Sequence, residues 1–508
     1  MLLFNHIILL FPIDLSRAWK FVSLEMTADA IHREDVTQAL VTETLQLLKA
    51  EYWQKPILEP APGSPEDITL KHQEYGADRR ETLEWSLAVR ILDSICTLMD
   101  SGIDGDIFAA ALDLHGRITV VLAKNGLPSE EDRTAARMLF RTVAHAKDDV
   151  WAIFPFILNR CHRKISKSLS KLRDSLQELD LEELWQVDYQ VQSLEDEFPN
   201  LVLLKEEGDY TTTELFRIKI SRVVELILEQ LVGVLDKQNE HTPFILENLH
   251  SVLCKIYQLS TTRIVQYEPE PLRRVKLPRR LFKVNRYLFA ALTLQAQAHR
   301  LWSGGQKIRH RWVMKSIPDP RTRLTKMHLT PSRLLEPWAL NITPSVSLKH
   351  QSWYPNAWTS WEHCILTRLH PEIRLVIHLD GFEALYNSAP DADFTAATDW
   401  RQLIPTSSRL RAIGCSKRVC YACSIWIRAY NSSLKTRWAS SETNGRIFVD
   451  WALPGNACWY LRLKRVPKAP DDRFLEALEK ELATLMSERG FEESRPDSKR
   501  EVYVMSGS

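Results

Sequence analysis

An apolar repeat with spacings of three and four residues runs through most of the first 315 residues and constrains the fold more than any other feature. It is clearest between Lys164 and Asp196, where charged residues separate eight apolar positions: Leu169, Leu172, Leu176, Leu179, Leu184, Val187, Val191 and Leu194. This spacing places the apolar side chains on one face of a helix. We therefore expect one long helix or a helical hairpin here, within an irregular all-α domain spanning residues 1–316.

The pattern changes after Ser316. Prolines, which interrupt helices, follow at Pro318, Pro320, Pro331, Pro337, Pro344 and Pro355. We expect a linker at residues 317–344. Beyond it, β-like runs at 362–369, 409–415, 445–453 and 500–505 alternate with helical segments. This alternation predicts an α/β domain at residues 345–508, in which helices cover a mixed sheet, so the expected fold class is multidomain, α followed by α/β.

The overall charge gives no general attraction to polyanions, because 66 lysines and arginines nearly balance 65 aspartates and glutamates. Residues 273–286 are a local exception, with seven cations and no acid. This basic block can bind phosphates. Alternatively, its cations can lie in solvent or pair with acids on other helices, such as Glu225 and Glu229. Both interpretations stay open.

Eight cysteines in 508 residues are too few for a disulfide scaffold and indicate a reducing compartment, so we expect an intracellular protein, cytoplasmic or nuclear. The apolar run within residues 1–15 is shorter than the roughly 20 residues that cross a bilayer. It also lacks the flanking features of a signal peptide. We interpret it as a buried first helix or as sequence ahead of a true start at Met26, and we expect no membrane partner.

Five of the cysteines lie in the last third of the chain, and two of them, Cys420 and Cys423, form a C-x-x-C pair. At the start of a helix, side chains three residues apart project from the same turn, and the helix N-terminus favours the thiolate that binds zinc. Two thiolates leave a tetrahedral zinc short of ligands. Upstream, His370 and Glu372 flank Pro371 at an expected helix start. One of these groups can bind the metal while the other addresses its water.

The segments LHPEIRLVIHL, IGCSKRVCYACSIWIRAY and GRIFVDWALP resemble the nucleic-acid/nucleotide deaminase-like superfamily, which has the zinc-dependent cytidine deaminase-like fold, and within it a fungal deaminase-like subgroup. The resemblance concerns the C-terminal domain alone. It implies a three-layer α/β/α domain with a mixed five-stranded sheet. It also implies His370, Cys420 and Cys423 as the ligands of a Zn²⁺ cofactor. Glu372 becomes the general acid and base.

The implied function is zinc-dependent hydrolytic deamination of a cytosine- or adenine-type base, in a nucleoside, a nucleotide or a single-stranded nucleic acid. Two positions depart from the family pattern: Pro371 replaces a common alanine, and Val419 replaces the proline before the first cysteine. Cys415 is expected to pack in the core, with metal ligation as the alternative. Trp426 and Trp451 are candidate substrate-binding aromatics, and core packing is the alternative for both.

Two other functions stay open from the sequence. The C-terminal domain can be a catalytically silent zinc module that serves as a binding or interaction protein, with the helical domain as the surface for a protein partner. A nucleic-acid-binding protein led by the basic block is the third interpretation, and the neutral overall charge speaks against it as the main role.

Overall fold

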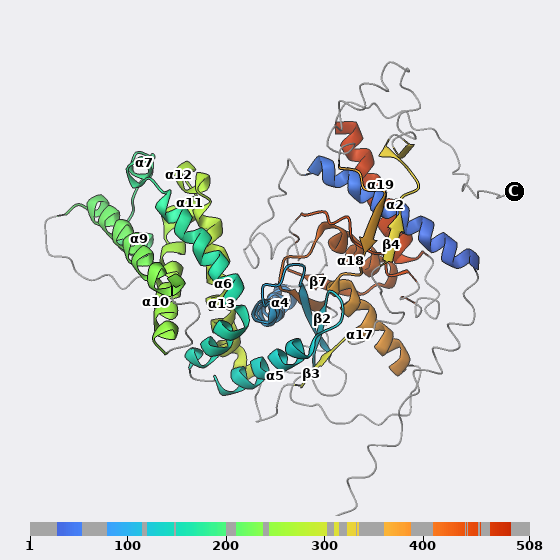
Figure 1. The fold of residues 1–508 in the computed structure, drawn as a ribbon, viewed down its shortest axis with the longest axis horizontal. Helices are drawn as coiled ribbons and strands as arrows, with labels where there is room; N and C mark the ends of the chain where they lie inside the picture. Colours follow the sequence, from blue (N-terminus) through green and yellow to red (C-terminus); the bar gives the residue numbers. More distant parts are fainter. Residues whose placement is uncertain are drawn as a thin grey trace, which may run out of the picture.

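A computed structural model gives the fold of the chain, which is drawn in Figure 1. The residues that it describes are 28–52, 79–113, 119–146, 149–199, 210–236, 243–301, 309–313, 323–331, 333–334, 360–387, 410–441, 443, 445–455, 458 and 468–488. No helix within these ranges is both long and apolar enough to cross a lipid bilayer. The apolar run at residues 1–15 and the expected strand at 500–505 lie outside the described residues.

A five-stranded mixed sheet forms the centre of the α/β part of the molecule. Its strands are β1 (Phe108–Asp113), β2 (Thr119–Lys124), β3 (Arg309–Trp312), β6 (Leu410–Cys415) and β7 (Arg437–Ser440). They lie side by side in the order β3-β2-β1-β6-β7. β1 is antiparallel to both of its neighbours, whereas the pairs β2–β3 and β6–β7 are parallel. The expected mixed five-stranded sheet is therefore confirmed.

The strands of this sheet come from both sides of the expected domain boundary. β1, β2 and β3 all precede residue 316, in the part of the chain that we had assigned to a helical domain. A short apolar run such as FAAALD in β1 cannot be told from a helical segment by its periodicity alone. Because β6 pairs directly with β1, the division into a helical domain at 1–316 and an α/β domain at 345–508 needs correction.

The other expected strands also differ in part from those observed. The run at 409–415 is confirmed as β6, but β5 (Cys364–Thr367) pairs with β4 (Arg323–Lys326) in a separate two-stranded sheet. Residues 445–453 form no strand, and a single β-bridge joins Trp451 to Arg368. The edge position beside β6 belongs to β7, which the sequence pattern did not indicate.

Helices cover both faces of the sheet (Figure 1). They are α2 (Ala28–Tyr52), α4 (Arg79–Met99), α17 (Pro371–Asn387), α18 (Tyr421–Leu434) and α19 (Pro470–Glu488). Successive side chains of a strand point to opposite faces, so Phe108 and Ala110 of β1 enter the core beneath α4. Ala109 and Ala111 enter the other core, with α17, α18, α2 and α19. This arrangement is the expected three-layer α/β/α structure.

A helical insertion separates β2 from β3. It contains α5 (Glu130–His145), a 3-10 turn (Val150–Ile153), α6 (Phe154–Gln177), α7 (Leu181–Trp185), α8 (Leu194–Glu197), α9 (Thr212–Asp236), α10 (Pro243–Ser260), α11 (Arg263–Tyr267), α12 (Glu270–Arg274) and α13 (Leu277–Leu301). Figure 1 shows these helices extending to the left of the sheet, and α13 packs against α4. The predicted helical region is confirmed in this insertion.

The long helix or hairpin expected between Lys164 and Asp196 is broken into shorter pieces. α6 ends at Gln177, and the side chain of Asp180 accepts a hydrogen bond from the backbone N–H of Glu183 at 3.1 Å, which caps α7. Aspartate is a favoured N-cap residue because its oxygen satisfies a free N–H of the first turn. The apolar spacing continued across this break, so periodicity alone did not reveal it.

Strand β6 and helix α4 approach each other closely at Gly414. A Cβ atom placed on Gly414 would lie 2.3 Å from the backbone carbonyl carbon of Leu92. Nearby, the Cys96 thiol donates to the carbonyl oxygen of Gly414 at 3.4 Å. Asp93 Oδ1 accepts a hydrogen bond from the backbone N–H of Cys415 at 2.6 Å. These contacts fix the end of β6, from which the chain turns toward α18.

We expect Gly414→Ala to lower the free energy of unfolding by about 1–3 kcal/mol, because the backbone of α4 must move to admit a methyl group. Gly233→Ala is the matched control. Gly233 lies within α9 and has no atom within 4 Å of an added Cβ, so alanine there should stabilise the protein by up to about 1 kcal/mol. Urea unfolding measures both effects, and a Gly414→Ala variant as stable as the wild type would contradict the close approach.

Candidate metal and active site

Four side chains that the sequence analysis selected come from two helix starts. His370 and Glu372 flank Pro371, the first residue of α17, and proline suits this position because its missing N–H would have no partner there. Cys420 is the N-cap of α18, with Cys423 in the first turn. The Cys420 sulfur replaces the usual capping oxygen and accepts a hydrogen bond from the Cys423 backbone N–H at 3.4 Å.

The imidazole and the two sulfurs of this group meet at one point. Nδ1 of His370 lies 3.4 Å from the sulfur of Cys420 and 3.4 Å from that of Cys423. The three ligand atoms all lie within 4.8 Å of one another, and all three side chains are buried. A tetrahedral zinc with ordinary bond lengths separates a nitrogen ligand from a sulfur ligand by about 3.6 Å. One nitrogen and two sulfurs at these separations fit a zinc ion and leave one coordination position to another ligand.

Glu372 lies beside this group and is not one of its three members. Its Oε2 accepts a long hydrogen bond from the Cys423 sulfur at 3.8 Å, and the side chain is 2% exposed. The buried Cys415 thiol, at the end of β6, lies beside this carboxyl group. A buried carboxyl group next to a metal-binding group, held by neighbours on two sides, is in a position that suits proton transfer.

Burial and mutual charge decide the ionisation of these side chains. Burial lowers the pKa of His370, but the negative charge of Cys420 and the nearby Glu372 outweigh it and raise the pKa to about 9. Burial opposes ionisation of Cys420, yet its hydrogen bond with Cys423 and the charge of His370 hold its pKa well below the usual range. Burial raises the pKa of Glu372. The protein atoms alone thus form an imidazolium–thiolate pair beside a carboxyl group that binds a proton readily.

Trp426 and Trp451, the aromatic residues considered for substrate binding, lie in the core with fully buried indoles. Trp426 donates its indole N–H to Asp471 at 2.8 Å and stacks on Tyr430. Trp451 donates to the sulfur of Cys423 at 3.2 Å. This geometry favours the core-packing alternative for Trp426. It places Trp451 behind the metal-binding group, where its indole holds a sulfur in position.

Three residues beside the site had no such role in the sequence analysis. Cys415 was expected to pack in the core, and it is buried, but its thiol also reaches Glu372. Asp93 holds the backbone of Cys415 from the middle of α4, and no local pattern marks it. The half-buried ring of Phe448 lies edge-on to the His370 imidazole, with centroids 6.0 Å apart. From the sequence, Phe448 could have been found only by its position in the segment just before the W-A-L-P run.

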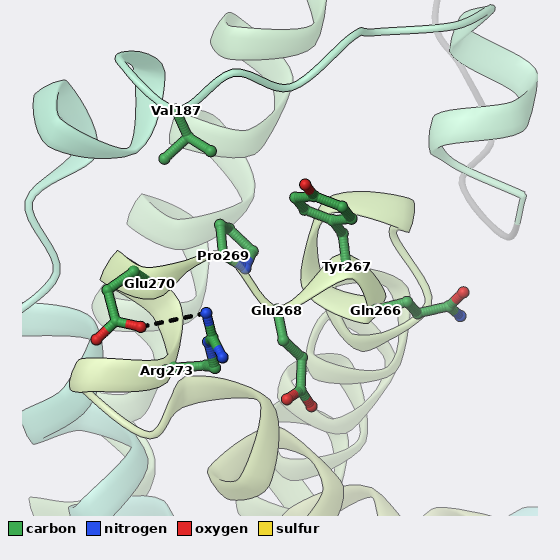
Figure 2. Close-up of a pocket in the computed structure, with 7 residues that line it drawn as sticks. All are labelled: Val187, Gln266, Tyr267, Glu268, Pro269, Glu270 and Arg273. Atoms are coloured by element: carbon green, nitrogen blue, oxygen red, sulfur yellow. Dashed lines mark ion pairs between the residues drawn. The ribbon is translucent and has the colours of Figure 1, made fainter.

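A separate concavity of about 520 Å³ lies in the helical insertion (Figure 2). It is lined by Val187, Gln266, Tyr267, Glu268, Pro269, Glu270 and Arg273. Figure 2 shows the ion pair between Glu270 and Arg273, whose charged atoms are 3.2 Å apart. The lining comes from α11, α12 and the segment after α7, none of which carries a member of the buried His/Cys/Cys group. This concavity is therefore not part of the candidate site.

Removal of one sulfur tests the metal-binding group. We expect Cys420→Ala to lower the zinc content of the purified protein from about one ion per chain to near zero, because the two remaining donors hold zinc weakly. Cys254→Ala in α10 is the matched control, since this free cysteine lies on the helical insertion. Mass spectrometry of the metal after dialysis gives the result. A Cys420→Ala variant with full zinc content would exclude Cys420 as a ligand.

Asp93 gives the protein a predictable pH dependence. Burial raises its pKa from 3.8 to about 7, against the hydrogen bond from Cys415. Between about pH 4 and pH 7, the folded protein therefore keeps the Asp93 proton that the unfolded chain has lost. The free energy of unfolding falls as pH rises through this range. Asp93→Asn, whose amide oxygen can still accept the Cys415 N–H, should remove this fall.

The wild type should lose about 2–3 kcal/mol of unfolding free energy between about pH 5 and pH 8, and the Asp93→Asn variant should not, so its advantage over the wild type should grow by this amount. Urea unfolding of both proteins at the two pH values measures the gain. Parallel pH profiles for the two proteins would mean that Asp93 is not a buried neutral carboxyl group.

Comparison with known proteins agrees with this arrangement. A family model described as "OTT_1508_deam:-like deaminase" matches residues 369–455. Searches of curated proteins and of solved structures returned no significant match. The matched range contains both helix starts and all four of their side chains. Residues 369–455 therefore match the model of a deaminase family, and the group formed by His370, Cys420 and Cys423 fits a zinc-binding cytidine deaminase-like site.

Proposed function

We propose that this protein is a zinc-dependent hydrolytic deaminase that acts on a cytosine- or adenine-type base in a nucleotide or nucleic acid. The observation that carries the proposal is the convergence of His370, Cys420 and Cys423, with Glu372 beside them. The match of residues 369–455 to a deaminase family supports it. The narrower likeness to a fungal subgroup, which rests on the sequence GCSK at 414–417, belongs to the same proposal.

The first task of the site is to hold the metal. His370, Cys420 and Cys423 would bind zinc, which would supply an acidified water for attack on the amidine carbon of the base. Hydrogen bonds from the Trp451 indole and from the Cys423 backbone fix the two sulfurs. Groups that orient metal ligands in this way raise metal affinity, because the ligands lose less freedom on binding.

The second task, proton transfer, falls to Glu372. Its carboxylate takes a proton from the attacking water and gives it to the ring nitrogen next to the attacked carbon. A second proton passes from the new hydroxyl group through Glu372 to the amino group. The C–N bond then breaks, so amidine and water become carbonyl product and ammonia. Burial raises the pKa of Glu372, which suits a group that must both accept and donate a proton.

Phe448 is the aromatic residue that we propose for contact with the base. It is half-buried, and its ring lies edge-on to the imidazole of His370. Flipped bases are commonly held between aromatic or apolar side chains. Trp426 and Trp451 are too deeply buried to offer a face to a substrate in this arrangement.

The alternative function is a catalytically silent zinc module that binds a partner, with the helical insertion as the interaction surface. Such a module needs the three metal ligands for its stability but has no need for a carboxyl group beside them. Glu372 is present beside the three ligands, and the Cys423 sulfur hydrogen-bonds it. This observation favours the enzyme over the silent module.

We expect Glu372→Gln to lower the turnover of a deaminated base by about 10²- to 10⁴-fold, because the amide cannot carry the protons. Its zinc content should stay at the wild-type level, since Glu372 is not a member of the metal-binding group. Glu229→Gln, at an exposed position on α9, is the matched control and should leave turnover unchanged.

Release of ammonia and mass spectrometry of the products measure turnover against cytosine- and adenine-containing nucleosides, nucleotides and oligonucleotides. Full activity of the Glu372→Gln variant would exclude this mechanism. Zinc binding without deamination of any of these compounds would favour the silent module.

A further inference from the structure

Cations from four separate parts of the chain gather beside the candidate site. This set, the basic face, consists of Lys164, Lys171, Arg279, Arg280, Lys283, Arg286, Lys417 and Arg446. Two of its members lie on α6 and four on α13, helices that pack against each other. Of the other two, Lys417 lies in the loop before α18, the helix whose start carries Cys420 and Cys423, and Arg446 lies in the segment after β7.

Hydrogen bonds hold these elements at the same end of the sheet as the site. Arg286 of α13 donates to Thr97 at 2.9 Å and to the carbonyl oxygen of Ser416, which directly follows β6. The backbone N–H of Tyr421, next to Cys420, donates to the carbonyl oxygen of Arg446 at 3.0 Å. The loop of Arg446 also carries Phe448. The basic face therefore adjoins the metal-binding group.

Lys164 pairs with the buried carboxylate of Asp100, whereas the cations Arg279, Arg280 and Lys283 of α13 are poorly neutralised. Burial, and after it the charges of Arg279, Arg280, Lys171 and Arg446, lower the pKa of Lys283 to about 8. Nε of Arg280 is buried without a hydrogen-bond partner. Within the described part of the chain, no carboxylate forms an ion pair with Arg279, Arg280 or Lys283.

The two arginines at the start of the basic block contrast with these. Arg273 pairs with Glu270, and Arg274 pairs with Glu183. The alternative in which acidic partners neutralise the basic block thus holds for its first residues and not for residues 279–286. Cations held together without acids repel one another, and a bound polyanion removes this cost.

Aromatic side chains lie among these cations. Phe282 and Phe289 of α13 are 54% and 42% exposed. With Arg279 and Arg286 they recur at spacings of three and four residues, so all four share one face of the helix. Exposed aromatic rings between cations are the combination that binds single-stranded nucleic acids, since the cations follow the phosphates and the rings stack on bases.

We propose that the basic face binds the backbone of a single-stranded polynucleotide and guides one of its bases into the candidate site. The inference rests on the proposed deaminase function and names a polymer as its substrate. A single strand is required because His370 and Glu372 are buried, and a base reaches such a site only when it is free of its duplex. The helical insertion thereby gains a role in substrate binding.

The test is fluorescence anisotropy with a labelled single-stranded oligonucleotide of about 20 nucleotides, in DNA and RNA forms, bound to the full-length chain carrying Glu372→Gln. In this background, Arg279→Ala/Lys283→Ala should weaken binding about tenfold at about 100 mM salt. It should also lower the slope of log affinity against log salt by about 1–2, because two phosphate contacts are lost. Phe282→Ala should weaken binding to a similar extent, about tenfold, without changing the slope.

The matched control is Arg217→Ala/Arg222→Ala, which removes two exposed cations from α9 and should bind as the parent does. Equal binding by the parent and the Arg279→Ala/Lys283→Ala variant would overturn the inference. So would binding of duplex DNA or of polyglutamate as tight as that of the single strand.

Deamination of free nucleosides separates this inference from the proposed function. With Glu372 intact, the Arg279→Ala/Lys283→Ala variant should deaminate nucleosides at the wild-type rate. If the wild type deaminates nucleosides but does not bind oligonucleotides, the proposed function is supported and nucleic-acid binding by the basic face is excluded. If it binds oligonucleotides but deaminates no base, the proposed function is excluded and nucleic-acid binding by the basic face is supported.

Discussion

The antiparallel pairing of β1 with β6 is the interaction on which the rest of this structure depends. It joins Ala109 to Cys415 and Ala111 to Ile413 across most of the chain. Through this pairing β6 lies against α4 at Gly414 and ends where the Cys415 thiol meets Glu372. α17 packs against β1 and β2 on the opposite face. The same sheet thus fixes the two helix starts that bring His370, Cys420 and Cys423 together.

The candidate site could be predicted from the sequence because its signals are local. A proline at a helix start marks the position between His370 and Glu372, and the spacing of Cys420 and Cys423 puts both sulfurs on one helical turn. The topology could not be predicted in the same way. The run in β1 is short, apolar and rich in alanine, so neither its period nor its composition separates a strand from a helix. Asp93 was missed because its contact with Cys415 spans distant segments and leaves no pattern in either.

The helical insertion enters and leaves the α/β part at two neighbouring strands, β2 and β3, which pair in parallel. A parallel pair needs a long crossover connection, and here the connection has grown into a bundle with its own buried residues. Because α13 packs on α4, Arg286 reaches Ser416 at the end of β6. The sequence of the basic block does not show this arrangement, in which Arg273 and Arg274 pair with glutamates while residues 279–286 lie beside the site.

One nitrogen and two sulfurs from two distant helix starts are expected to bind a single zinc ion, and X-ray absorption spectroscopy at the zinc edge of the purified protein measures this ligand set. We expect two sulfur ligands at about 2.3 Å and one nitrogen ligand at about 2.0–2.1 Å, with a light atom completing the shell. A zinc shell without sulfur, or with four sulfurs, would contradict it.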